Sequence, residues 1–177
     1  MSNSETIPKP GSWMYKMTVD QKSSNRFLKL FKIMNKIVVP LYRLRILPLF
    51  GFGFRILMLT TIGHRTKKLR RTPVEYFKID GVIHIVAGYG LNAHWFQNIR
   101  SNPEKVTVQV GFRSFHPKIE ILEGDRLEEF FKWMVRKNPK YSSYGFGWDP
   151  KTDDPDTADF SYISKAMRVI KLHKRES

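Results

Sequence analysis

The spacing of apolar side chains changes its period near residue 55. From residue 25 to residue 39, in NRFLKLFKIMNKIVV, apolar residues recur every three or four positions, as on one side of an α-helix. Asn25 is a suitable N-cap for this helix and Pro40 a suitable stop. The pattern predicts an amphipathic helix with lysines on one side and an apolar stripe on the other, formed by Phe27, Leu30, Phe31, Met34, Ile37 and Val38.

After residue 55 apolar side chains alternate with polar ones, as in β-strands. β-branched and aromatic residues dominate these runs, and Asp80-Gly81 is a strong signal for a hairpin. The pattern predicts six strands, at 55–63, 74–80, 82–90, 106–111, 113–122 and 166–173. It also predicts helices at 92–102 and 124–138, with a loop rich in Pro, Gly and Asp before the last strand.

Short local connections between these strands favour an antiparallel sheet over a parallel one. We therefore expect a mainly β, α+β fold in which a small antiparallel barrel is flanked by helices. The chain divides into a polar leader of residues 1–24, a basic amphipathic helix with an apolar connector at 25–54, and a barrel domain at 55–177. We expect a loosely ordered leader, part of which can be pinned to a surface by Trp13, Met14, Tyr15 and Met17. One domain suits a chain of 177 residues.

Positive charge gathers in the front of the chain. Residues 1–73 hold fifteen Lys and Arg against two acidic residues, a net charge of +13, whereas residues 74–177 hold sixteen against fourteen. Such a field attracts nucleic acid, an anionic membrane or a small anionic ligand. The basic helix has two interpretations: its apolar stripe packs on the core, or it lies in a membrane interface with its lysines on lipid headgroups.

Composition excludes several kinds of site. The chain has no cysteine, so it has neither disulfides nor thiolate metal sites, and its five histidines show no metal-ligand spacing. We expect no metal. The first 25 residues lack the apolar core of a secretory signal, and the longest uncharged apolar run, residues 46–54, is far shorter than the roughly 20 residues that span a bilayer. We expect a cytoplasmic protein, or one bound at a membrane surface.

The stretch TTIGHRTKKLRRTPVEYF, residues 60–77, concentrates cations between two predicted strands. Like charges repel one another unless an anion lies among them. Backbone N–H groups at a turn around Gly63, together with arginine side chains, suit a phosphate or a carboxylate. Taken alone, the motif fits a solvated basic loop equally well. The permanent cations of this stretch are Arg65, Lys67, Lys68, Arg70 and Arg71.

The same stretch continues into further motifs. LTTIGHRTKKLRRTPVEYF, DGVIHIVAGYG, NAHWFQNIRSNP and VTVQVG, in this order, resemble the deazaflavin-dependent nitroreductase family, the split-barrel reductases that use coenzyme F420. The similarity runs from about residue 55 to residue 122 and resumes at NPKYSSY. It implies a split antiparallel β-barrel like those that bind FMN, and it implies coenzyme F420 as the cofactor.

The resemblance also implies roles for single residues. The anionic phosphate and glutamate tail of the coenzyme would contact His64, Arg65, Thr66 and Arg70. The deazaflavin ring would lie near Thr72, Pro73, Val86, Ala87, Gly88 and Tyr89, and the next helix would add His94, Trp95 and Asn98. Two positions depart from the family pattern: His64-Arg65 replaces Arg-Lys, and Lys67 stands where the family has glycine.

An acceptor pocket is implied beside the late segment NPKYSSYGFGW. Tyr141 and Tyr144 would border the acceptor there, as proton donors or as an aromatic wall that Phe146 extends. Trp148 is interpreted as a packing residue. Gly88 lacks the hydroxyl that some relatives present to the acceptor.

The implied function is hydride transfer from reduced coenzyme F420 to an electrophilic small molecule, such as a quinone, an enone or a nitro compound. Two alternatives remain: an FMN oxidoreductase with the same barrel, and a non-enzymatic basic protein that binds nucleic acid or an anionic membrane, the latter through Asn25–Val39. Nucleic acid is disfavoured because residues 62–72 contain no aromatic side chain on which a base could stack. A homodimer is expected by analogy with similar barrels.

Overall fold

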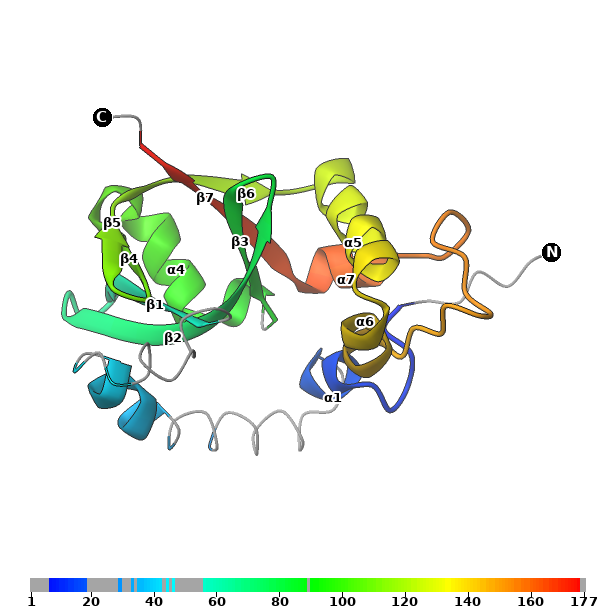
Figure 1. The fold of residues 1–177 in the computed structure, drawn as a ribbon, viewed down its shortest axis with the longest axis horizontal. Coiled ribbons are helices and arrows are strands. Elements are labelled where there is room, and N and C mark those ends of the chain that lie inside the picture. Colours follow the sequence, from blue (N-terminus) through cyan, green and yellow to red (C-terminus); the bar gives the residue numbers. More distant parts are fainter. Residues whose placement is uncertain are drawn as a thin grey trace.

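Seven β-strands form one antiparallel sheet that curls into a half-barrel (Figure 1). The structure is a computed structural model that describes residues 7–18, 29, 33, 35–42, 44, 46, 56–88 and 90–175. The strand order is β5-β4-β1-β2-β3-β7-β6. The strands are β1 Ile56–Ile62, β2 Leu69–Ile79, β3 Val82–Ala87, β4 Thr107–Val110, β5 Arg113–Phe115, β6 Pro117–Leu122 and β7 Arg168–Lys174. The predicted mainly β, split antiparallel barrel is confirmed.

Strand β2 carries the chain from one half of the sheet to the other. Residues 69–75 of β2 pair with β1, and residues 76–79 pair with β3. Because the partner changes between Glu75 and Tyr76, the β2–β3 ladder begins only at Tyr76. At the far end of β3, Ala87 pairs with Arg168 of β7. The barrel therefore splits between the first half of β2 and the end of β3.

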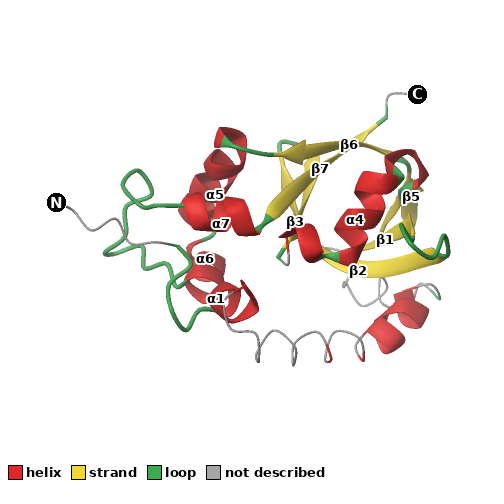
Figure 2. Ribbon diagram, turned by 180° about the vertical axis from the view of Figure 1, so that it is seen from behind, coloured by secondary structure: helices red, strands yellow, loops and turns green. Residues whose placement is uncertain are grey.

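Two hydrophobic cores stabilise the described part of the chain. The first lies within the curl of the sheet, where helix α4, His94–Ser101, packs against β1 and buries Phe96 and Ile99 (Figure 1). The second lies at the end of the sheet remote from β4 and β5, beneath a layer of helices (Figure 2). These helices are α1 Trp13–Thr18, α5 Asp125–Lys137, α6 Pro139–Phe146 and α7 Ser161–Ala166.

Two of these helices replace the predicted loop between the second helix and the last strand. Helix α6 buries Ser142 and Phe146, and α7 buries Ile163, all against the second core or its neighbours. Tertiary packing overrides the weak helix propensity of PKYSSYGF and SYISKA, which carry Pro, Gly, Ser and Tyr. A loop prediction based on composition is therefore wrong at both places.

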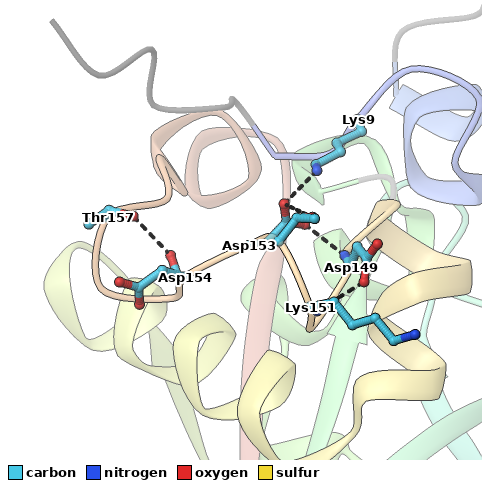
Figure 3. Close-up of polar contacts among 7 residues, drawn as sticks. Lys9, Asp149, Lys151, Asp153, Asp154 and Thr157 are labelled. Carbon is cyan, nitrogen blue, oxygen red and sulfur yellow. Dashed lines mark hydrogen bonds and ion pairs between the residues drawn. The ribbon is translucent and has the colours of Figure 1, made fainter.

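Residues 7–18 are also part of the folded layer. Ile7 and Met14 are buried, and the backbone N–H of Ile7 donates to the carbonyl of Asp159 at 3.1 Å. The Lys9 ammonium lies 2.7 Å from Asp153 Oδ1, and Asp153 Oδ2 accepts the Asp149 N–H (Figure 3). Although burial raises the pKa of Asp153, these contacts lower it below the usual value. The prediction of a loosely ordered leader is thus wrong for residues 7–18.

The predicted helix Asn25–Val39 lies partly outside the described residues. Its described part is helical, and residues 35–42 continue past the predicted stop at Pro40, whose carbonyl accepts the Leu44 N–H at 2.9 Å. The predicted stop at Pro40 is therefore wrong, since the backbone stays helical on both sides of it. Tyr42 anchors this helix: its hydroxyl accepts the Gly111 N–H at 3.1 Å and lies 3.1 Å from the Ile56 carbonyl. No helix in the described ranges is long and apolar enough to cross a membrane.

Three predicted strands differ from the structure by more than two residues at an end or in their number. Strand β2 begins at Leu69 rather than at residue 74, so the basic residues Arg70 and Arg71 belong to the sheet. Strand β3 ends at Ala87 rather than at residue 90. The predicted strand 113–122 is two strands that meet at His116, because Pro117 has no N–H for a continuous ladder and is tolerated as the first residue of a strand.

Candidate functional site

The cationic turn, defined as residues 63–71, joins β1 to β2. The Gly63 N–H donates to the Lys68 carbonyl, and the Lys67 N–H donates to the Gly63 carbonyl, both at 2.8 Å. A Cβ at Gly63 would lie 2.6 Å from Thr66 Oγ1 and 3.3 Å from the Lys68 carbonyl oxygen, so a larger residue would require the Thr66 side chain to move. Lys67 has a φ of 55°, in the left-handed region that favours glycine. The turn thus holds Lys67 in a conformation that glycine would adopt without strain.

The five permanent cations of the turn are all exposed. Arg70 Nη2 donates to Thr66 Oγ1 at 3.3 Å, which orders that arginine along the turn. Within the described ranges, none of the five cations forms an ion pair with a carboxylate. Uncompensated positive charge on a fixed backbone turn attracts a multiply charged anion. The fixed turn and its exposed cations are therefore consistent with the predicted anion-binding site, which stays a prediction.

Asn98 on α4 fastens the cationic turn to the barrel. Its side chain is buried, and Oδ1 accepts the His64 backbone N–H at 2.9 Å and lies 3.1 Å from His64 Nδ1. Because Oδ1 only accepts hydrogen bonds, His64 Nδ1 carries a hydrogen. Asn98 Nδ2 donates to the hydroxyl of the buried Thr61 at 3.1 Å. Asn98 thus positions the turn, and its described hydrogen bonds stay within the protein.

Thr61 is a residue that sequence reasoning missed. The only sequence signal was its place one residue before the apolar end of β1, where a polar side chain interrupts the strand pattern. His94, at the first turn of α4, stacks near the same point: the His64 and His94 ring centroids are 6.4 Å apart with 20° between the planes. The structure therefore brings together the predicted tail residues and two of the predicted helix residues.

The predicted ring residues line the place where the barrel splits. Thr72 and Pro73 are half-buried on the part of β2 that pairs only with β1 among the described strands. Val86 is half-buried and Ala87 fully buried at the end of β3. Gly88 follows β3, and Tyr89 lies outside the described residues. Trp95 is placed differently: it is half-buried, packs on the barrel core and forms an edge contact with Phe96 at 6.4 Å.

Tyr141 lies at the other end of β2. Its ring packs edge-on against Phe77 of β2 at 5.3 Å and faces Phe146 of α6 at 6.4 Å. Burial, with a smaller contribution from the negative charge of Glu75, raises the pKa of the Tyr141 hydroxyl well above its usual range. The hydroxyl therefore stays protonated and available as a hydrogen-bond donor.

The two predicted catalytic tyrosines have different surroundings. Tyr144 is 70% exposed on α6, whereas Tyr141 is half-buried. Phe146 and Trp148 are buried in the second core, which agrees with a packing role for Trp148. The structure therefore separates the exposed Tyr144 from Tyr141, which packs on Phe77 of β2 and on Phe146.

Other features of the described chain do not form a second site of this kind. A shallow depression of about 340 Å³ lies between the end of α4 and β6, and it contains none of the predicted site residues. It is lined by Ile99, Arg100, Pro103, Ile119 and Ile121. Within the described ranges, no three His, Cys, Asp or Glu side chains gather at a distance suitable for a metal ion.

Comparison with known proteins gives the same chemistry as the motifs. The sequence model of one family, described as F420H(2)-dependent quinone reductase, matches residues 48–152. Among solved structures, the chain is similar to an F420-H2 dependent reductase, FDR-A, with 26% identity over 67% of this chain and 94% of that one, at a TM-score of 0.43. A domain-swapped dimer has 25% identity over 67% of this chain and 80% of that one, at a TM-score of 0.43. A Listeria innocua protein titled a pyridoxamine 5'-phosphate oxidase has 15% identity, covers 69% of this chain and 85% of that one, and has a TM-score of 0.44.

Proposed function

The chain belongs to the F420H(2)-dependent quinone reductase family, and from this premise we propose that it passes a hydride from reduced coenzyme F420 to a quinone-type acceptor bound at the split of the barrel. The protein is an F420H2-dependent oxidoreductase, and coenzyme F420 is its cofactor. One observation carries the placement of the site: five exposed cations without carboxylate partners, among the described residues, gather on a fixed turn at the start of β2.

The residues present fit a long anionic coenzyme. The cationic turn would hold the tail, and β2 would lead from it toward the ring. Arg70 and Phe77 are seven residues apart on β2, roughly 23 Å at about 3.3 Å per residue. A ligand that extends along this strand would reach from the cations to the aromatic end, with Thr72 and Pro73 at its middle. The part of β2 before Tyr76 pairs with β1 alone among the described strands, which supports a ligand on its other side.

Each end would have a separate task in the reaction. When bound, the coenzyme supplies the hydride, so the protein contributes orientation and electrostatics. Arg65 and Arg70 would hold the anionic tail, and Asn98 would keep their turn in place. Tyr141 would donate a hydrogen bond to the acceptor oxygen, while the Phe77 and Phe146 rings exclude water from it. Hydride transfer leaves a negative charge on the acceptor, and one proton then completes its reduction. Tyr144, which faces solvent, or water itself would supply that proton.

A binding titration tests the cationic turn. The Arg65→Ala and Arg70→Ala double variant is expected to weaken binding of oxidised coenzyme F420 at least about tenfold, because each charge-assisted contact contributes about 1.5 to 3 kcal/mol. The measurement is quenching or enhancement of the coenzyme's fluorescence at physiological salt. The control is the Arg113→Ala and Lys137→Ala variant, which removes two exposed cations on β5 and α5, away from the turn.

The same titration separates the alternatives. FMN and a short DNA duplex are titrated in parallel with the coenzyme. A folded double variant that binds the coenzyme as tightly as the wild type contradicts the proposed site. A wild-type chain that binds FMN or DNA but not the deazaflavin contradicts the proposed cofactor use.

A membrane contact by the basic helix is a second proposal, favoured by the exposure of its apolar residues. Ile33 and Ile37 are 55% and 59% exposed, and they lie one helical turn apart. Lys29 and Lys36 are also exposed. An exposed apolar stripe beside lysines suits the interface of an anionic bilayer. A quinone-type acceptor with a long apolar tail would be dissolved in such a bilayer, so this contact would bring the enzyme to its substrate.

Vesicle sedimentation tests this contact. The chain is expected to sediment with vesicles of anionic phosphatidylglycerol more than with neutral phosphatidylcholine. The Ile33→Ser and Ile37→Ser double variant should lose that difference while it keeps its coenzyme affinity. Equal sedimentation of wild type and variant would show that the stripe does not contact lipid.

The homodimer stays a prediction. A domain-swapped dimer is among the similar structures, but that assembly is a property of the other protein. Light scattering behind a gel-filtration column measures the mass of this chain in solution, and a single mass near 20.9 kDa would contradict a dimer.

A further inference from the structure

One carboxylate lies among the strands that form the split of the barrel. Glu75 is exposed on β2, and of the residues in β1, β2 and β3 it alone is acidic. It is the last residue of β2 that pairs with β1, opposite Ile56, and the β2–β3 ladder begins at the next residue. These three strands therefore carry one negative charge, at the point where the two halves of the sheet separate.

The register of the sheet brings Glu75 beside the proposed ring site. The β2–β3 ladder ends at the pair of Tyr76 and Ile85, and the same register continued by one step puts Glu75 opposite Val86. Residues opposite each other on antiparallel strands lie on one face of the sheet. Because Val86 is one of the predicted ring residues, Glu75 borders the proposed ring site from across the split.

Glu75 also lies beside the proposed acceptor position. It is two residues from Phe77 on β2, so both side chains are on the same face of the strand. The Phe77 ring packs against the Tyr141 ring at 5.3 Å between centroids. Burial does most to raise the pKa of Tyr141, and the negative charge of Glu75 raises it further. The carboxylate is therefore within electrostatic reach of the hydroxyl that is proposed to bind the acceptor oxygen.

The cations of β2 are too far away, or on the wrong face, to cancel this charge at the split. Arg71 shares the face of Glu75 but is four residues away, roughly 13 Å at about 3.3 Å per residue. That separation exceeds the Debye length of about 8 Å at physiological ionic strength. Lys78 is three residues from Glu75 and so lies on the opposite face. Burial lowers the pKa of His84, which leaves this neighbour of Phe77 neutral at physiological pH.

We propose that Glu75 determines acceptor specificity by charge: it disfavours anionic electrophiles at the split, so that neutral quinones are the preferred class. Coulomb repulsion acts without contact, so the acceptor need not touch the carboxylate. A like charge that opposes the wrong partner is a general source of specificity. The same repulsion keeps the anionic tail of the coenzyme at the cationic turn, which favours one orientation along β2. The inference rests on the proposed acceptor position at Tyr141.

Steady-state kinetics with two acceptors of different charge test this inference. Menadione is a neutral naphthoquinone, and a naphthoquinone sulfonate is an anionic one. The specificity ratio is kcat/KM for the sulfonate divided by kcat/KM for menadione. It should rise about twofold to fivefold in Glu75→Gln, the effect expected for an exposed pair of charges. Glu75→Lys should raise it further because attraction replaces repulsion. Comparing this ratio between variant and wild type cancels the different intrinsic reactivities of the two quinones.

Asp156→Asn is the matched control. Its side chain is 70% exposed in the loop between α6 and α7, which lies at the side of the molecule away from the barrel (Figure 1). This variant removes one negative charge, as Glu75→Gln does, and should leave the specificity ratio unchanged. Binding of the sulfonate without coenzyme, followed by quenching of tryptophan fluorescence, should tighten in Glu75→Gln only. Added salt should reduce the effect of Glu75→Gln, because ions screen exposed charges.

The outcomes separate this inference from the proposed function. A specificity ratio in folded Glu75→Gln that equals the wild-type ratio overturns the inference and leaves the proposed function intact. The same holds if Asp156→Asn changes the ratio as much. A wild-type chain that oxidises the reduced coenzyme with neither quinone overturns the proposed function, and this inference with it. Melting temperatures check that the Glu75 variants fold, as expected for substitutions of an exposed residue.

Discussion

The two ends of β2 differ in electrostatics: one carries charges exposed to water, and the other carries a neutral hydroxyl removed from water. At its start, the cationic turn exposes five positive charges to water, and a single buried amide, Asn98, holds the turn in place. At its far end, Phe77 packs on Tyr141, where burial keeps a neutral hydroxyl protonated. Charge that stays in water costs little in folding and remains free to attract an anion. A hydroxyl removed from water is positioned firmly and is protected from solvent.

Because of this difference, we expect the two ends to affect different quantities, the coenzyme affinity and the turnover rate. Attraction between exposed charges is screened by salt, since the Debye length is about 8 Å at physiological ionic strength. Hydrogen bonds in a desolvated site are much less sensitive to salt. Changes at the cationic turn should therefore appear mainly in coenzyme affinity and vary with salt. Changes at Tyr141 should appear mainly in the rate and vary little with salt.

The largest expected effect on stability and binding comes from the one buried group that supports the exposed end. Asn98→Ala leaves the His64 N–H and the Thr61 hydroxyl without their partner, which should lower the free energy of unfolding by about 1 to 3 kcal/mol. Coenzyme binding should weaken more than tenfold because the turn loses its fixed position. Thermal unfolding and fluorescence titration measure the two effects. Gln97→Ala, which removes only an exposed side-chain bond to the Leu91 carbonyl, is the control.

If Asn98→Ala lowered stability but left coenzyme affinity within twofold, the turn would not depend on Asn98 for binding. The proposal that the cationic turn sets coenzyme affinity, while the Tyr141 end sets the rate, would then not be supported by Asn98.

At the aromatic end, Tyr141→Phe keeps the ring and removes the hydroxyl. We expect kcat to fall about a hundredfold, the lower end of the range for a positioned proton donor, while coenzyme Kd and melting temperature stay close to wild type. Tyr144→Phe should lower kcat less, because that hydroxyl is in water and a solvent molecule can replace it. Steady-state kinetics at saturating coenzyme measure both. Equal kcat for Tyr141→Phe and wild type would reduce Tyr141 to a packing residue.

Lowering the pH should destabilise the folded chain at the aromatic end of β2 through His84, the cross-strand neighbour of Phe77. Burial lowers the pKa of His84, although its hydrogen bond to the Val82 carbonyl opposes the shift. The unfolded chain therefore binds this proton at a higher pH than the folded chain, and stability falls as the pH drops below the ordinary histidine range of about 6.5. His84→Phe retains the stack on Phe130 and should flatten this dependence. Urea unfolding at several pH values between about 5 and 8, which bracket that range, measures the pH dependence of the free energy of unfolding. If this free energy changed with pH equally in the variant and the wild type, the role of His84 would be contradicted.

The smallest expected effect concerns the shape of the cationic turn. Lys67→Gly relieves a left-handed backbone conformation but gives the unfolded chain more freedom, so the two contributions nearly cancel. Stability should change by less than about 1 kcal/mol. Coenzyme affinity should change by only a few fold, because one of five exposed charges is lost. A shift of several kcal/mol in denaturant unfolding would show that Lys67 has contacts beyond the turn.

The positions of most strands and of the cations along the chain could be predicted from sequence because both depend on local patterns. Alternation with period two identifies the strands of the barrel, and Asp80-Gly81 has the positive φ values that its hairpin requires. The cationic turn is continuous in sequence, from Gly63 to Arg71. Each of these segments takes its local conformation from its own residues, and pairing in the sheet does not change that conformation.

The partners of those residues could not be predicted, because they come from distant parts of the chain. Asn98 meets Thr61 across 37 positions, and Arg168 meets Ala87 only through strand pairing. Helices α6 and α7 lack a helical pattern and form because the second core covers them. The different exposure of Tyr141 and Tyr144 follows from the same packing, three residues apart on one helix. The roles of the predicted cofactor and catalytic residues stay predictions until the variants are measured.

The contact of Lys9 with Asp153 spans 144 positions of the chain. During synthesis, residues 7–18 leave the ribosome long before the segments that they contact, so the second core cannot close until translation is nearly complete. The barrel core, built mostly from residues 57–172, includes none of these N-terminal residues. Residues 7–18 would therefore stay without these contacts until the segment around Asp153 and Asp159 is made, and their closure on that segment would be a late step of folding.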